Sequence, residues 1–72
     1  MNKNQELQKL AKKIKDIRNK KNLSQEQLAE KCGFDRTYIS MLERAKRNPS
    51  YINLLKLSEG LEVNISELLN FT

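Results

Sequence analysis

The segment Gly33-Phe34-Asp35 constrains the fold most, because it places a helix stop and a helix start almost next to each other. Glycine readily adopts the left-handed conformation that ends many helices. Aspartate is one of the residue types favoured at the N-cap, where a helix begins. The sequence therefore predicts a helix that ends at Gly33 and a second helix from Asp35 to about Arg44, joined by a tight turn.

The rest of the chain also has helical patterning. Serine or asparagine precedes three apolar segments, which predicts helices that begin after Ser24, Ser50 and Asn64. Gln27 and Glu67 occupy the capping-box position three residues after two of these caps. No segment alternates apolar and polar residues over the length of a strand. Helical spacing over about residues 4–20 is shown by Leu7, Leu10, Ala11, Ile14 and Ile17. We therefore expect an all-α fold in which residues 1–72 form one compact five-helix bundle.

Composition excludes several classes of protein. A chain of 72 residues is long enough for only one core. Because it has no histidine and only one cysteine, Cys32, the chain cannot build a Ser–His or Cys–His pair, an internal disulfide or a zinc cluster. We expect no enzyme activity, metal or cofactor. The longest apolar runs are two residues, so no membrane span is predicted. No continuous apolar core follows the amino-terminal lysines, so no signal peptide is predicted.

The net charge of +5 indicates a polyanionic partner, either nucleic acid or an acidic membrane surface. Residues 1–22 contain eight basic and two acidic side chains, whereas residues 50–72 contain one and three. We expect the polyanion to contact the first two-thirds of the chain. A membrane-surface role for the first helix is disfavoured, because its apolar stripe lacks aromatic anchors and is needed in the bundle.

Two short helices joined at a glycine turn make a helix-turn-helix arrangement, here over about residues 24–44. The polar start of its second helix suits the DNA major groove. Four segments in and around this motif are similar to those of a known family: Leu23-Ser24-Gln25-Glu26-Gln27-Leu28-Ala29, Tyr38-Ile39-Ser40, Leu42-Glu43-Arg44 and Arg47-Asn48-Pro49-Ser50. These segments resemble the phage-repressor-like (Xre-type) helix-turn-helix family, which has the fold of the lambda-repressor DNA-binding domain. Residues 35–40 and 60–63 are most similar to one branch, the controller proteins of restriction–modification systems.

The resemblance implies roles for individual residues. Base reading falls at the start of the second helix, on Arg36, Thr37 and Ser40, where an arginine can bond bidentately to guanine. Contacts to phosphate, which fix register without reading sequence, fall on the family positions held by Arg44, Lys46, Arg47 and Asn48. Apart from the resemblance, two further phosphate contacts are expected, from Gln25 at a helix N-terminus and from the hydroxyl of Tyr38. Structural alternatives stay open: a solubilising arginine at 36, an exposed helix former at 25, a packed ring at 38 and a solvated charge run from 44 to 47.

Two charged residues lie where isolated surface charges are not expected. Arg18 falls within the apolar stripe of the first helix, and Glu43 directly follows the core residue Leu42. The resemblance implies an ion pair between Arg18 and Glu43 that joins the first and third helices. The alternative is two independent surface charges. A third charged residue, Glu62, stands where the wider family often has glycine, which predicts mild strain in a left-handed conformation.

The carboxy-terminal third, about residues 50–72, is apolar and acidic, which suits self-association better than DNA binding. The excess of apolar residues and the resemblance together predict a dimer surface formed by Tyr51, Ile52, Val63, Leu69 and Phe71. Some of these residues, Val63 first among them, are alternatively part of the core.

Together these features predict a transcription regulator that binds double-stranded DNA as a homodimer on a palindromic operator. By resemblance, we expect a controller protein that regulates its own gene and a linked restriction endonuclease gene. The alternative is an antitoxin or phage-type repressor that binds DNA only with a protein partner. We expect a bacterial cytoplasmic location, association with the nucleoid through DNA, and no small-molecule effector.

Overall fold

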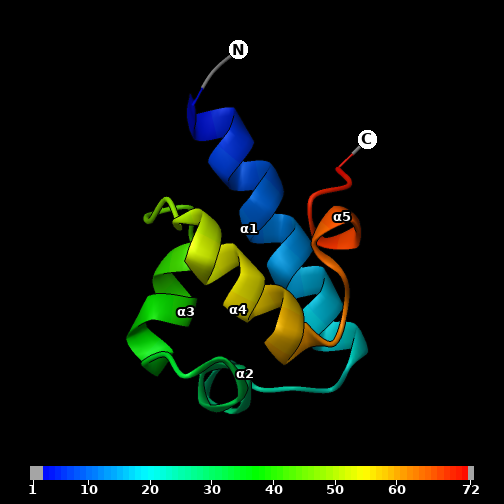
Figure 1. Cartoon of the computed structure of the whole chain (residues 1–72). Helices are drawn as coiled ribbons and strands as arrows, with labels where there is room; N and C mark the ends of the chain where they lie inside the picture. The colour runs from blue at the N-terminus through cyan, green and yellow to red at the C-terminus, as the bar shows by residue number, and fades with distance from the viewer. Residues whose placement is uncertain (1–2, 72) are drawn as a thin grey trace.

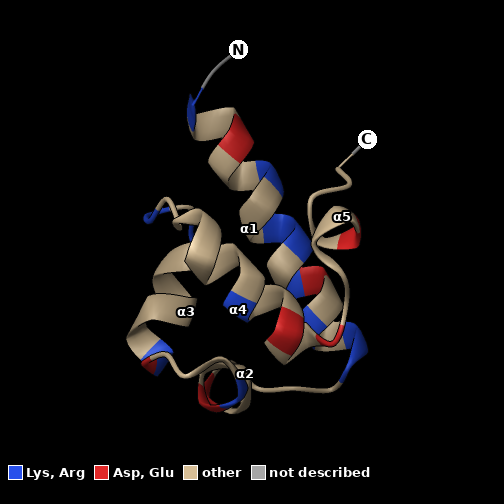
Figure 2. Ribbon diagram, viewed as in Figure 1, with Lys and Arg blue, Asp and Glu red and all other residues tan. Residues whose placement is uncertain are grey.

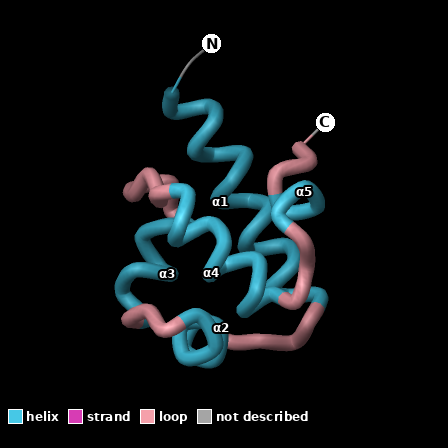
Figure 3. The backbone as a smooth tube through the Cα atoms, in the orientation of Figure 1, coloured by secondary structure: helices cyan, strands magenta, loops and turns pink. Residues whose placement is uncertain are grey.

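The computed structural model describes residues 3–71, which form five helices in the order α1 (Lys3–Lys20), α2 (Gln25–Cys32), α3 (Arg36–Glu43), α4 (Tyr51–Leu61) and α5 (Ile65–Leu68) (Figure 1). The described part of the chain contains no strand (Figure 3). The helices α2 and α3 pack against each other, α2 also packs against α4 and α3 against α1, and α5 contacts both α1 and α4. The predicted all-α five-helix bundle is therefore confirmed.

Local capping signals set most of the helix boundaries. The Ser24 hydroxyl accepts a hydrogen bond from the Gln27 backbone N–H at 3.0 Å, and the Ser24 N–H donates to Gln27 Oε1 at 2.8 Å. At the start of α4 the Ser50 hydroxyl accepts a hydrogen bond from the Asn53 backbone N–H. At the start of α5 Asn64 Oδ1 accepts one from the Glu67 backbone N–H. Asp35 occupies the N-cap of α3, but its side chain makes no capping hydrogen bond. The helix α3 therefore begins at the predicted position, although it lacks the side-chain hydrogen bond that makes aspartate a favoured N-cap residue.

Left-handed residues end two of the helices. Gly33 has φ +79° and closes α2, as its position predicted. Glu62 has φ +59° at the end of α4, which confirms the left-handed conformation expected there. Lys31 Nζ lies 3.5 Å from Glu62 Oε2 and joins this turn to α2. Ala45 has φ +59° directly after α3 and directs the chain into the basic loop, a conformation that nothing in the sequence indicated.

The core is made by one apolar side of every helix. Two charged side chains are also shielded from solvent, Arg18 of α1 and Glu43 of α3. In α4, Leu57 is fully buried, and Leu54 and Leu55 are half-buried. The buried apolar cluster consists of Leu10, Ile14, Ile17, Leu28, Ala29, Cys32, Ile39, Leu42, Leu57, Leu61 and Leu68. None of the helices in residues 3–71 is both long and apolar enough to cross a bilayer.

Cys32 lies where α2 meets α4, close to the backbone of Gly60. Burial raises the pKa of the Cys32 thiol to about 11, and a backbone hydrogen bond with Gly60 only partly offsets the rise. The folded protein therefore keeps the thiol protonated at alkaline pH values where the same thiol ionises in the unfolded chain.

This difference in pKa predicts an alkaline loss of stability. Because the folded-state pKa is the higher one, the contribution is fully present below pH 9 and declines as pH rises toward 11. We expect the free energy of unfolding, measured with urea, to fall more steeply over this interval in the wild type than in Cys32→Ala. Equal slopes in the two proteins would rule out the thiol as the cause.

Candidate nucleic-acid interface

The helices α2 and α3 form a tight pair around the Gly33 turn. Phe34 N–H donates to the Ala29 carbonyl at 2.8 Å, which fastens the turn to the end of α2. Ala29 and Leu28 are buried between the helices, together with Ile39 of α3. Because Ala29 is small, the helix backbones approach closely, and the outer side of α3 is left facing solvent. This is the helix-turn-helix geometry expected for residues 24–44.

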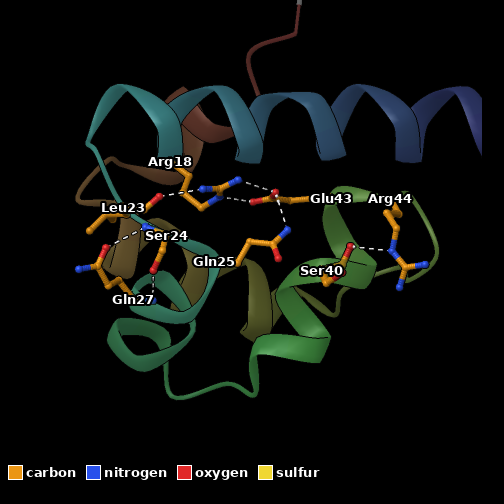
Figure 4. A network of polar contacts seen from close by, with 8 residues as sticks. All are labelled: Arg18, Leu23, Ser24, Gln25, Gln27, Ser40, Glu43 and Arg44. Atoms are coloured by element: carbon orange, nitrogen blue, oxygen red, sulfur yellow. Dashed lines mark hydrogen bonds and ion pairs between the residues drawn. The ribbon is translucent and has the colours of Figure 1, made fainter.

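The residues expected to read bases lie on the first two turns of α3. Arg36 and Thr37 are exposed, whereas Ser40 is half-buried. The Ser40 carbonyl accepts a 3.4 Å hydrogen bond from Arg44 Nε, so Arg44 folds back along the helix (Figure 4). The side chains of Arg36 and Thr37 are therefore accessible to a ligand, and the side chain of Ser40 is less accessible.

A basic segment follows α3. Arg44, Lys46, Arg47 and Asn48 are all exposed, and they occupy the end of α3 and the loop before α4. Figure 2 shows basic residues both at the start of α3 and in this loop. The Lys46 N–H donates to the Met41 carbonyl at 2.8 Å, which anchors the loop to α3. Positive charge therefore lies on Arg36 at the start of α3 and on the basic segment that follows the helix.

The Tyr38 side chain contacts residues before and after α3 and does not project freely into solvent. Its ring contacts Phe34 edge to face, with centroids 4.8 Å apart, and the Arg47 guanidinium lies over it at 5.2 Å. Its hydroxyl oxygen accepts a 2.9 Å hydrogen bond from Asn53 Nδ2. The ring of Tyr38 is therefore packed, while its hydroxyl still has a hydrogen that can be donated to a phosphate. No pattern in the sequence indicated Asn53, because its contact with Tyr38 depends on how α4 lies against α3.

Arg18 and Glu43 are paired in the interior of the helix-turn-helix. Arg18 Nε and Nη2 donate to the two carboxylate oxygens of Glu43 at 2.6 and 3.0 Å. Arg18 Nη1 also donates to the Leu23 carbonyl at 2.7 Å, just before α2 (Figure 4). Because the side chains are only 11% and 3% exposed, the pair is shielded from water. It joins α1 to both helices of the motif.

Gln25, expected at a phosphate, takes part in this same network. Its Nε2 donates to Glu43 Oε1 at 3.1 Å, and the side chain is half-buried (Figure 4). An amide nitrogen carries two hydrogens, so one remains for a ligand at the start of α2. The structure therefore gives Gln25 an internal partner that sequence reasoning missed.

The five residues expected at a dimer surface fall into two groups. Tyr51, Ile52 and Leu69 are exposed by 65%, 58% and 41%, which is unusual for large apolar side chains. Val63 and Phe71 are half-buried and pack against the core. The exposed apolar residues lie at the start of α4 and the end of α5.

Comparison with known proteins identifies the family. The helix-turn-helix family matches residues 14–68, which include all of α2, α3 and α4. The chain belongs to this helix-turn-helix family. The prediction of a DNA-binding regulator, and not an enzyme, is confirmed by this membership and by the relatives.

No group of three or more His, Cys, Asp or Glu side chains within residues 3–71 is placed to hold a metal ion.

The relatives include restriction–modification controller proteins, as the resemblance indicated. The chain is 49% identical to control protein C.BamHI of Bacillus amyloliquefaciens over 61 residues, which cover 83% of this chain and 75% of that protein. It is 49% identical to control protein C.MunI of a Mycoplasma species, with 78% and 77% covered. The crystal structure of controller protein C.AhdI from Aeromonas hydrophila superposes with a TM-score of 0.84 at 42% identity, covering 86% and 94%.

Proposed function

We propose that this protein is a homodimeric controller protein that binds a palindromic operator and regulates its own gene and a linked endonuclease gene. One observation carries the proposal: a helix-turn-helix exposes Arg36 and Thr37, with a basic segment after α3, in a chain similar to controller proteins. We place it in the bacterial cytoplasm, on nucleoid DNA. In this proposal, the concentration of the protein itself sets operator occupancy.

In this mechanism, reading and anchoring are divided between two sets of residues. Arg36 contacts a guanine through two hydrogen bonds, and Thr37 and Ser40 contact neighbouring base edges. Tyr38, Arg44, Lys46, Arg47 and Asn48 hold the phosphates that flank the groove, and Gln25 holds one at the start of α2. The division is supported by exposure of Arg36 on α3 and of Lys46 in the loop after it.

The division predicts different effects for two charge-removing substitutions. Arg36→Ala should relax sequence preference at one operator position, with a loss of about 1–3 kcal/mol against the preferred base. Lys46→Ala should weaken binding to all duplexes similarly and reduce the slope of log affinity against log salt by about one per subunit. Fluorescence anisotropy with single-position operator variants at several salt concentrations separates the two. Indistinguishable profiles would contradict the division.

The proposed dimer interface centres on the exposed apolar residues of α4 and α5. Two copies related by a two-fold axis would bury Tyr51, Ile52 and Leu69 against the same residues of the partner. Val63 and Phe71, which already pack on the core, would contribute by their remaining exposed atoms. Such burial also enlarges the thin apolar core of a 72-residue chain.

A charge placed in this interface should separate the subunits. Ile52→Asp puts a carboxylate on the first turn of α4, where the helix dipole favours it and the monomer stays folded. In the dimer that carboxylate would be buried without a partner, so we expect the dimer dissociation constant to rise at least roughly tenfold. Sedimentation equilibrium measures it, with exposed Gln8→Asp on α1 as the matched control. A dimer unaffected by Ile52→Asp would place the interface elsewhere.

A further inference from the structure

A polar contact links α4 to the DNA-facing helix at Asn53. Asn53 lies on the first turn of α4, where its backbone N–H donates to the Ser50 hydroxyl at 3.1 Å. Its side-chain Nδ2 donates to Tyr38 Oη at 2.9 Å. Both side chains are half-buried. The amide is therefore held at a fixed place beside the phenol by the cap of its own helix.

The direction of this hydrogen bond decides what the phenol can do. A tyrosine hydroxyl has one hydrogen to donate and an oxygen that accepts. Because Asn53 supplies the hydrogen of their bond, it occupies an acceptor position on Tyr38 Oη and leaves the hydroxyl hydrogen unused. A phosphate oxygen only accepts, so the unused hydrogen is what a phosphate requires.

The surroundings of Tyr38 fix the ring that carries this hydroxyl. Phe34 contacts one side edge to face at 65°, and the Arg47 guanidinium lies over the ring. Arg47 is exposed and belongs to the basic loop after α3. The hydroxyl and a cation therefore approach the same region of the surface, which suits one anionic oxygen shared between them.

We propose that Asn53 is a positioning residue for DNA binding, which holds the Tyr38 hydroxyl so that its hydrogen is donated to a DNA phosphate. The inference rests on the proposed function. It adds a residue that contacts no DNA itself and that belongs to α4 and not to the helix-turn-helix. A side chain at position 53 that accepts the hydroxyl hydrogen should withdraw it from the phosphate.

Asn53→Asp makes this exchange with little change in shape. The carboxylate has no hydrogen to donate and accepts the one on Tyr38 instead. An acidic residue three positions after the N-cap is favourable for a helix, so the variant should fold with an unchanged or higher melting temperature. The probe is a duplex selected by the wild-type protein from random DNA. We expect Asn53→Asp and Tyr38→Phe each to weaken its binding about tenfold or more.

A double-mutant cycle separates the exchange from the added negative charge. In the Tyr38→Phe background there is no hydroxyl hydrogen to withdraw, so Asn53→Asp should weaken binding less than about threefold further. Asn53→Ala, which leaves the hydroxyl free to rotate, should lie between the wild type and Asn53→Asp. Equal losses from Asn53→Asp in both backgrounds would assign the effect to charge and overturn the inference.

The same measurements distinguish this inference from the proposed function. If the wild type binds the selected duplex and Tyr38→Phe binds it equally well, the roles of Asn53 and of the Tyr38 hydroxyl are wrong, whereas the proposed function as a DNA-binding regulator stands. If the purified wild type selects and binds no duplex, both are wrong.

Discussion

Replacing Glu43 with alanine should lower the free energy of unfolding by about 3–5 kcal/mol, the largest single effect expected outside the apolar core. The Glu43 carboxylate accepts hydrogen bonds from Arg18 Nε, Arg18 Nη2 and Gln25 Nε2. Its side chain is only 3% exposed, so water cannot replace these bonds without opening the structure. Removal leaves the Arg18 cation buried beside the Leu23 carbonyl with its main partner gone.

Glu43→Gln tests the charge separately from the shape. Glutamine keeps one acceptor oxygen but turns the other towards Arg18 as an amide N–H donor, so we expect a clear fall in melting temperature. The matched control is Asp16→Asn, which removes the charge from an exposed pair whose atoms are 2.8 Å apart. That variant should melt close to the wild type, because solvent screens exposed pairs. An unchanged melting temperature for Glu43→Gln would mean that the buried pair contributes nothing.

Gly60→Ala should destabilise the protein by about 1–3 kcal/mol, although alanine favours helix formation. A Cβ built on Gly60 would overlap Cys32 Sγ and would lie 3.5 Å from Leu28 Cδ1. Cys32 is itself buried, with 7% exposure, so its sulfur has little room to turn away. The cost is overpacking between α2 and α4, which moves the helix-turn-helix relative to the proposed dimer helix.

Removing the sulfur should restore the space. Cys32→Ala/Gly60→Ala should be more stable than the sum of the single changes predicts, since the added methyl group occupies the volume that Sγ leaves. Glu59→Ala, at an exposed neighbour on α4, controls for helix propensity. Chemical denaturation of the four proteins measures the coupling. Simple additivity would show that the contact between Gly60 and Cys32 does not limit the packing.

The helices could be predicted from sequence because the signals that define them are local. Ser24, Gly33 and Ser50 act on residues within one turn, so both ends of α2 and the start of α4 follow from neighbouring residues alone. Asp35 shows the limit of this logic, since its helix starts as predicted without the side-chain bond. The apolar stripe of α1 likewise indicated buried Leu10, Ile14 and Ile17.

The polar contacts between helices could not be predicted from local pattern. The pairing of Arg18 with Glu43 was implied by resemblance, and its residues are 25 positions apart. The bonds from Gln25 to Glu43 and from Asn53 to Tyr38 depend on crossing angles that no single-helix pattern encodes. The left-handed Ala45 depends similarly on how the loop returns from α3 to α4. Sequence and its resemblance to a family therefore indicated the candidate DNA-facing residues. The structure added the hydrogen bonds that position two of them, Gln25 and Tyr38.

The central claim is that this chain by itself reads a DNA sequence through α3. The most direct measurement is selection from random duplex DNA with the purified wild-type protein, followed by the same selection with Arg36→Ala. We predict that the wild type enriches a palindromic site and that Arg36→Ala loses preference at one position in each half-site. Enrichment of no sequence, with no gel shift at low salt, would contradict it and favour a regulator that needs a protein partner to bind DNA.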